Sequence, residues 1–62
     1  MRHYREAIEL LERAAKQFRF YEQVHRDKAE QTTFPDAIDA ALAKADCNAK
    51  LAHRIEEFLS AD

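Results

Sequence analysis

Five side chains with helical spacing could together hold a phosphate-bearing ligand. Tyr21, His25 and Lys28 follow one another at steps of four and three residues, which places them on one face of an expected first helix. Lys44 and Asn48 are four residues apart on an expected second helix and should point toward Tyr21. The lysines would supply positive charge, His25 and Asn48 hydrogen bonds, and the tyrosine ring a stacking surface for a base.

Two neighbours extend this set. Phe18 offers a second ring for stacking, and Arg26, like Arg19, could contact phosphate from the flank of the first helix. The predicted ligand-binding residues are Phe18, Tyr21, His25, Lys28, Lys44, Asn48 and Arg26.

Each member of the set also has a purely structural explanation, which the sequence leaves open. His25 and Lys28 could be solvated where the pair of helices opens to water, and Tyr21 could be a core residue with its hydroxyl at the rim. Asn48 could set the register of helix pairing, as a polar residue in a coiled-coil contact line often does.

The elements that would position these residues are two long helices. The chain has no glycine, a single proline (Pro35) and twelve alanines, a composition that favours helix and leaves few points to break one. Thr33 is the expected N-cap of the second helix, with Pro35 in its first turn. We predict an all-α fold, an antiparallel two-helix hairpin with helices at about residues 2–30 and 34–60, forming a single domain over residues 1–62.

Alternating steps of three and four residues predict the contact line between the helices. On the first helix the line comprises positions 4, 7, 11, 14, 18, 21, 25 and 28, and on the second positions 34, 38, 41, 45, 48, 52, 55 and 59. Residues whose numbers sum to about 63 to 66 should face each other across a short turn. Large side chains of the first helix would then meet small ones of the second.

A second apolar set lies outside this line, and one hairpin has no interior to bury it. With only 62 residues and one cysteine, the chain has a small core and no internal disulfide, so we expect a homo-oligomer. A dimeric four-helix bundle is the simplest closure, although a larger ring would serve equally. The predicted oligomer interface consists of Ile8, Leu10, Phe20, Val24, Leu42, Leu51 and Phe58.

Composition and charge exclude several classes of function. The net charge of −2 is too small for bulk binding to nucleic acid or membrane. Residues 1–30 carry seven Lys/Arg against six Asp/Glu, while residues 33–62 carry three against six, so the first half is the better place for an anion. The three histidines fall at different levels of the hairpin, and no nucleophile has a base within reach. We expect no enzymatic activity, no cofactor and no metal. A lone cysteine and the lack of a long apolar run predict a cytoplasmic protein.

The chain also resembles two groups of known proteins. In size and inferred shape it resembles the small plasmid-copy-control RNA-binding hairpin proteins, which dimerise into four-helix bundles. The pattern FRFYEQVHRDK followed by KADCNAKLAHRIEEFL, over residues 18–59, is similar to short orphan proteins encoded by tailed phages. This likeness implies a phage accessory role in the host cytoplasm. The anti-CBASS sponges, helical oligomers that sequester cyclic-nucleotide immune signals, offer a functional analogy.

Three functions follow as hypotheses. The first is a non-enzymatic homo-oligomer that binds a small anionic ligand, a nucleotide immune signal. The second is a protein-interaction module that inhibits or adapts a host protein through the surface around Phe20 and Val24. The third is binding of structured RNA through Arg5, Arg19 and Arg26, which ranks last because the chain has so little positive charge.

Overall fold

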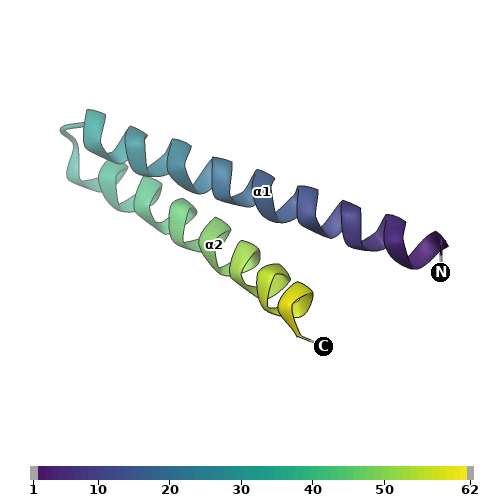
Figure 1. Cartoon of the computed structure of the whole chain (residues 1–62). Coiled ribbons are helices and arrows are strands. Elements are labelled where there is room, and N and C mark those ends of the chain that lie inside the picture. Colours follow the sequence, from purple (N-terminus) through teal and green to yellow (C-terminus); the bar gives the residue numbers. More distant parts are fainter. Residues whose placement is uncertain (1, 62) are drawn as a thin grey trace.

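The computed structural model consists of two helices packed side by side and joined by a short turn (Figure 1). It describes residues 2–61, with side chains from Tyr4 onward. Helix α1 spans Arg2–Gln31 and helix α2 spans Pro35–Ser60. The predicted all-α hairpin is confirmed, and both helices begin and end within one residue of the expected bounds.

The turn differs from the prediction at the N-cap of α2. Phe34, rather than Thr33, is the N-cap; its backbone is extended (φ −89°, ψ 120°) and its side chain makes no capping hydrogen bond. The residue before a proline is disfavoured in helical geometry, so Phe34 stays extended and the helix starts at Pro35. The Phe34 carbonyl oxygen accepts the first helical bond from the Ile38 N–H at 2.9 Å.

Alanines form the tightest part of the contact between the helices. Ala15 and Ala29 of α1 are buried, as are Ala41, Ala45 and Ala52 of α2. Among the described residues, no side chain larger than alanine is buried. Such small side chains let two helices approach closely, but they remove little apolar surface from water. The hairpin alone therefore has a thin core.

The predicted contact line of α2 agrees with the burial of its side chains. Its buried and half-buried residues include positions 38, 41, 45, 48, 52, 55 and 59, which continue the predicted series. Only the first member of that series, Phe34, departs from it, because it belongs to the turn and is 72% exposed.

The predicted contact line of α1 is partly wrong. Positions 11, 14, 18 and 25 are half-buried as expected, but the predicted positions 7, 21 and 28 are exposed. The positions that alternate with 11, 18 and 25 are instead 8, 15, 22 and 29, each of them buried or half-buried. One residue corresponds to a rotation of about 100° on a helix. Helix α1 therefore turns Ile8 and Glu22 toward α2, and it leaves Tyr21 and Lys28 exposed on its flank.

The facing residues agree with the predicted pairing in part. Leu11 borders a depression with Ile55, a partner within the predicted range, and with Phe58, whereas Glu12 borders one with Leu59, more than one turn further along α2 than predicted. Because α2 ends at Ser60, the first turns of α1 project past it at the open end of the hairpin (Figure 1).

Candidate functional site

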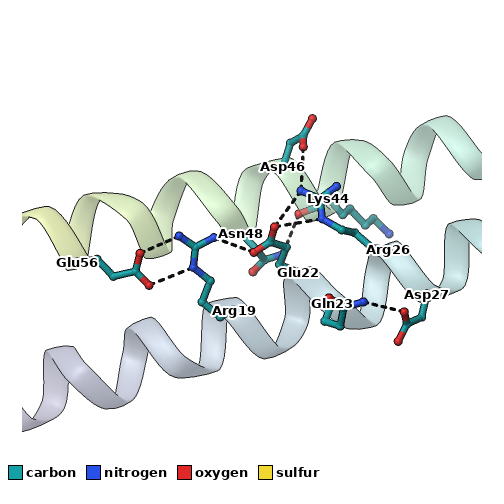
Figure 2. Close-up of polar contacts among 9 residues, drawn as sticks. All are labelled: Arg19, Glu22, Gln23, Arg26, Asp27, Lys44, Asp46, Asn48 and Glu56. Carbon is teal, nitrogen blue, oxygen red and sulfur yellow. Dashed lines mark hydrogen bonds and ion pairs between the residues drawn. The ribbon is translucent and has the colours of Figure 1, made fainter.

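Five charged side chains link the two helices along one flank of the hairpin (Figure 2). Arg19 donates from Nε and Nη2 to the two carboxylate oxygens of Glu56 at 3.0 and 2.7 Å, and from Nη1 to Glu22 at 2.9 Å. Arg26 donates to the other Glu22 oxygen at 3.1 and 2.9 Å and lies 3.5 Å from Asp46. We call this alternating series the ion-pair ladder. Both arginines lie on α1, and each reaches a carboxylate on α2.

The ladder favours the charged form of two of its carboxylates, Glu22 and Glu56. Hydrogen bonds from Arg19 lower the pKa of Glu56, and hydrogen bonds from Arg19 and Arg26 lower the pKa of Glu22. The same bonds raise the pKa of both arginines. Three carboxylates and two guanidinium groups leave a net charge of −1, so the ladder as a whole does not attract an anion.

The sequence contained a partial signal for this ladder. Arg19, Glu22 and Arg26 are spaced by three and four residues, which brings their side chains together on one helix face. The crossing partners, Asp46 and Glu56, depend on the register between the helices and could not be identified from spacing alone. Arg26 is therefore engaged by two carboxylates, and a ligand would have to compete with both for it.

The two flanks of the hairpin can be told apart from the contact lines. Arg19 and Arg26 each come one residue after a half-buried contact-line position of α1, and Glu56 comes one residue after such a position of α2. Because Arg19 bonds to Glu56, the residues that follow contact-line positions lie on the same side of the hairpin in both helices, and this side carries the ladder. Residues that precede a contact-line position by one lie on the other flank. Tyr21 and Lys44 are of this kind.

Three of the predicted ligand-binding residues lie toward the turn end of this second flank: Tyr21, which is 43% exposed, and the exposed Lys28 and Lys44. His25, one helical turn from Tyr21 and from Lys28, is half-buried in the α1 contact line. No ion pair within the described part of the chain includes either lysine. We call His25, Lys28 and Lys44 the basic cluster.

The three other predicted members are engaged within the hairpin, and one of them, Arg26, belongs to the ion-pair ladder. Asn48 is half-buried in the α2 contact line, and its Nδ2 donates to the backbone oxygen of Lys44 at 2.8 Å (Figure 2). Phe18 is half-buried in the α1 contact line. Tyr21 keeps its ring at the surface, where it packs edge-on against Phe20 with centroids 5.6 Å apart. Tyr21 is thus the ring best placed to stack on a ligand.

Most of the predicted oligomer-interface residues are exposed. Leu10 and Phe20 are each 63% exposed, and Ile8 alone is half-buried, because it faces the α2 side of α1. The set is divided between the flanks: Leu42 follows a contact-line position and lies on the ladder flank, whereas Leu51 precedes one. The remaining members, Val24 and Phe58, also precede contact-line positions and are exposed.

Within the described part of the chain, no three or more His, Cys, Asp or Glu residues form a group that could hold a metal ion. His53 instead lies 2.7 Å from Glu57, one turn along the same helix. Neither helix is long and apolar enough over its described residues to cross a membrane. Comparisons with family models, curated proteins and solved structures found no match to this chain.

Proposed function

We propose that the hairpin is a non-enzymatic homo-oligomer that binds a small anionic ligand of the nucleotide type at its basic cluster. The observation that carries this proposal is the position of Lys28 and Lys44, exposed on the flank opposite the ion-pair ladder and in no ion pair among the described residues. Ammonium groups without carboxylate partners attract phosphate, and the neighbouring Tyr21 ring can stack on a base. In a phage setting, such a protein would sequester a nucleotide immune signal.

The pairing of the arginines counts against the RNA-binding hypothesis. Arg19 and Arg26 both belong to the ion-pair ladder, so phosphate contacts would require breaking bonds to Glu22 and Glu56. The ladder's net negative charge would also repel a nucleic-acid backbone.

Calorimetric titration with linear and cyclic nucleotides tests the proposal. Lys28→Gln and Lys44→Gln should each weaken binding at least about tenfold, because each removes a charge from the site. Lys50→Gln is the matched control: it makes the same change at an exposed α2 position outside the basic cluster, and it should bind normally. Equal binding by all three variants, or no binding of any nucleotide to the native protein, would contradict the proposal.

A second candidate, a protein-interaction module, is favoured by the exposure of Phe20 and Val24. Under this hypothesis, Phe20→Asp should abolish capture of a host protein, while Ala43→Asp, at an exposed α2 position, should not. Nucleotides should then leave the melting temperature unchanged. Retained capture by Phe20→Asp would remove this surface from consideration.

A further inference from the structure

The first turns of α1 carry its contact line past the end of α2. The buried and half-buried positions 8, 11 and 15 extend back by one further step of four residues to Tyr4. Helix α2 ends at Ser60, where the backbone of the following Ala61 is extended, and Leu59 borders a depression with Glu12. Residues 4–9 of α1 therefore project beyond α2 at the open end of the hairpin (Figure 1). We call this segment the overhang.

The overhang carries a shallow depression to which α2 contributes no residue. The depression is lined by Tyr4, Arg5, Ile8, Glu9 and Glu12, all of them on α1. Tyr4 is 69% exposed, and Ile8 is half-buried. Neither Arg5 nor Glu9 makes an ion pair with another described residue. An aromatic ring, an isoleucine and two opposite charges therefore lie together without a partner among the described residues.

The ion-pair ladder shows how similar residues meet across the hairpin. Arg19 comes directly after the half-buried Phe18 of α1, and Glu56 comes directly after the half-buried Ile55 of α2. Arg19 donates two hydrogen bonds to Glu56, at 3.0 and 2.7 Å. In this protein, an aromatic residue followed by arginine and an isoleucine followed by glutamate are thus the two halves of one antiparallel contact.

The overhang contains both halves of this contact on one helix. Arg5 comes directly after Tyr4, and Glu9 comes directly after Ile8, about one turn further on. Such a segment is complementary to a copy of itself, since a two-fold axis makes every contact twice. When two overhangs lie antiparallel, Tyr4 of each copy faces Ile8 of the other, and Arg5 of each then reaches Glu9 of the other. A parallel pairing would set both charges against the flank that carries Leu10 and would form no ion pair.

We infer that the overhang docks onto the overhang of a second copy of this chain, and that two Arg5–Glu9 ion pairs between the copies fix the antiparallel arrangement. Each copy contributes about two turns, so the contact belongs with the weak associations that bury less than about 1,200 Å². Exposed ion pairs are screened by salt. The dimer should therefore dissociate on dilution and at high ionic strength.

This inference rests on the homo-oligomer part of the proposed function, for which it names the surface, and it does not depend on anion binding. The overhangs meet at the open ends of the two hairpins, so the two turns lie at opposite ends of the dimer. Each basic cluster then stays within its own hairpin. Nucleotide binding and dimerisation should not influence each other.

Charge reversal tests the pairing, measured by sedimentation equilibrium at protein concentrations from about 10 µM to about 1 mM. Arg5→Glu and Glu9→Arg should each weaken dimerisation at least about tenfold, because each variant sets like charges against each other in both ion pairs. Glu6→Arg is the matched control: it reverses a charge at an exposed α1 position away from the contact line, and it should dimerise as the native chain does.

An equimolar mixture of the Arg5→Glu and Glu9→Arg chains tests whether the ion pairs form between copies. One chain then has two acidic side chains at positions 5 and 9 and the other has two basic ones, so a mixed dimer regains both ion pairs. We expect mixing to restore association to the native level. Each chain keeps its own like charges one turn apart, so this recovery cannot arise within a helix. Single variants that dimerise normally, or a mixture that stays monomeric, would overturn the inference.

Spin-label distances test the end-to-end arrangement. With Cys47→Ser removing the native thiol, a nitroxide at Glu6→Cys should give a distance between copies far shorter than the 50 Å length of the hairpin. A nitroxide at Thr33→Cys in the turn should give a distance longer than that length. A short distance between the two turns would contradict the paired overhangs.

The outcomes separate the inference from the proposed function. A chain that oligomerises normally after reversal of Arg5 or Glu9 would overturn the paired overhangs and leave the homo-oligomer standing. A chain that stays monomeric at all concentrations would overturn both the inference and the homo-oligomer, while nucleotide titration would still decide the anion site. An overhang dimer that binds no nucleotide would overturn the proposed ligand and leave the inference standing.

Discussion

Arg19 of α1 donates two hydrogen bonds, of 3.0 and 2.7 Å, to the carboxylate of Glu56 on α2. Arg26 reaches Asp46 nearer the turn, and Glu22 bridges the two arginines. Glu22 can make these contacts because it lies on the side of α1 that faces α2, where the sequence had predicted Tyr21. Charged contacts on one flank and alanine packing between the helices together define the hairpin, and several larger apolar side chains, among them Leu10, Phe20 and Phe58, stay exposed.

The lowered pKa values of Glu22 and Glu56 predict a loss of stability in acid. A carboxyl whose folded pKa lies below its ordinary value of 4.5 stabilises the fold fully above that pH, and the stabilisation is lost as the pH falls through the lower folded pKa. We expect the melting temperature, followed by circular dichroism, to decline below about pH 4.5. Glu56→Gln should flatten this decline, whereas Glu6→Gln, outside the ladder, should not. Equal acid profiles for both variants would show that the ladder contributes nothing.

Enlarging a buried alanine should separate the helices. Ala52 has no exposed surface, so Ala52→Leu should lower the free energy of unfolding by about 1–3 kcal/mol through overpacking. Ala43→Leu makes the same change at an exposed position of α2 and should have little effect. Urea denaturation of both variants measures the difference. Equal stability would mean that the two helices are not packed closely enough for a larger side chain at position 52 to separate them.

The lack of a capping side chain at the N-terminus of α2 predicts a stabilising substitution. Phe34 makes no capping hydrogen bond, so Phe34→Asp should raise the free energy of unfolding by about 1 kcal/mol relative to Phe34→Ala. Urea denaturation checks the comparison, in which both variants lose the same exposed ring. A less stable aspartate variant would contradict the described geometry of the turn.

Asn48 should be replaceable by leucine without loss of stability. Its Nδ2 bonds back to the Lys44 carbonyl within the same helix, and asparagine is a poorer helix former than leucine. We expect Asn48→Leu to raise the free energy of unfolding by roughly 0.5 kcal/mol, measured by thermal and urea denaturation. A marked destabilisation would reveal a further bond that Asn48 supplies.

Much of the fold could be predicted from sequence because its signals are local. The lack of glycine and the single Pro35 define two helices, and alanines at steps of three and four mark the α2 contact line. The contact line of α1 could not be predicted in the same way. Its most apolar stripe passes through Tyr21, but the residue that faces α2 is Glu22. Helical spacing alone does not determine which of two neighbouring stripes turns toward the second helix.

The candidate site could be predicted in part for a related reason. Helical spacing correctly places Tyr21 and Lys28 on one flank of α1, since that depends on a single helix. It could not reveal that Arg26 is held by Asp46, since that pair depends on the register between two helices. The sequence also could not reveal that Asn48 bonds to the backbone of its own helix, because an asparagine side chain can form several different hydrogen bonds.

The projecting first turns of α1 should set a gradient of amide protection along the helix. Tyr4 is 69% exposed, and the depression beside it is lined by residues of α1 alone, so only local helical bonds hold this segment. Isolated turns without tertiary packing fray readily. Amide hydrogens near Tyr4 should exchange fastest, while those near Ala15, packed against α2, should exchange only on opening of the whole hairpin.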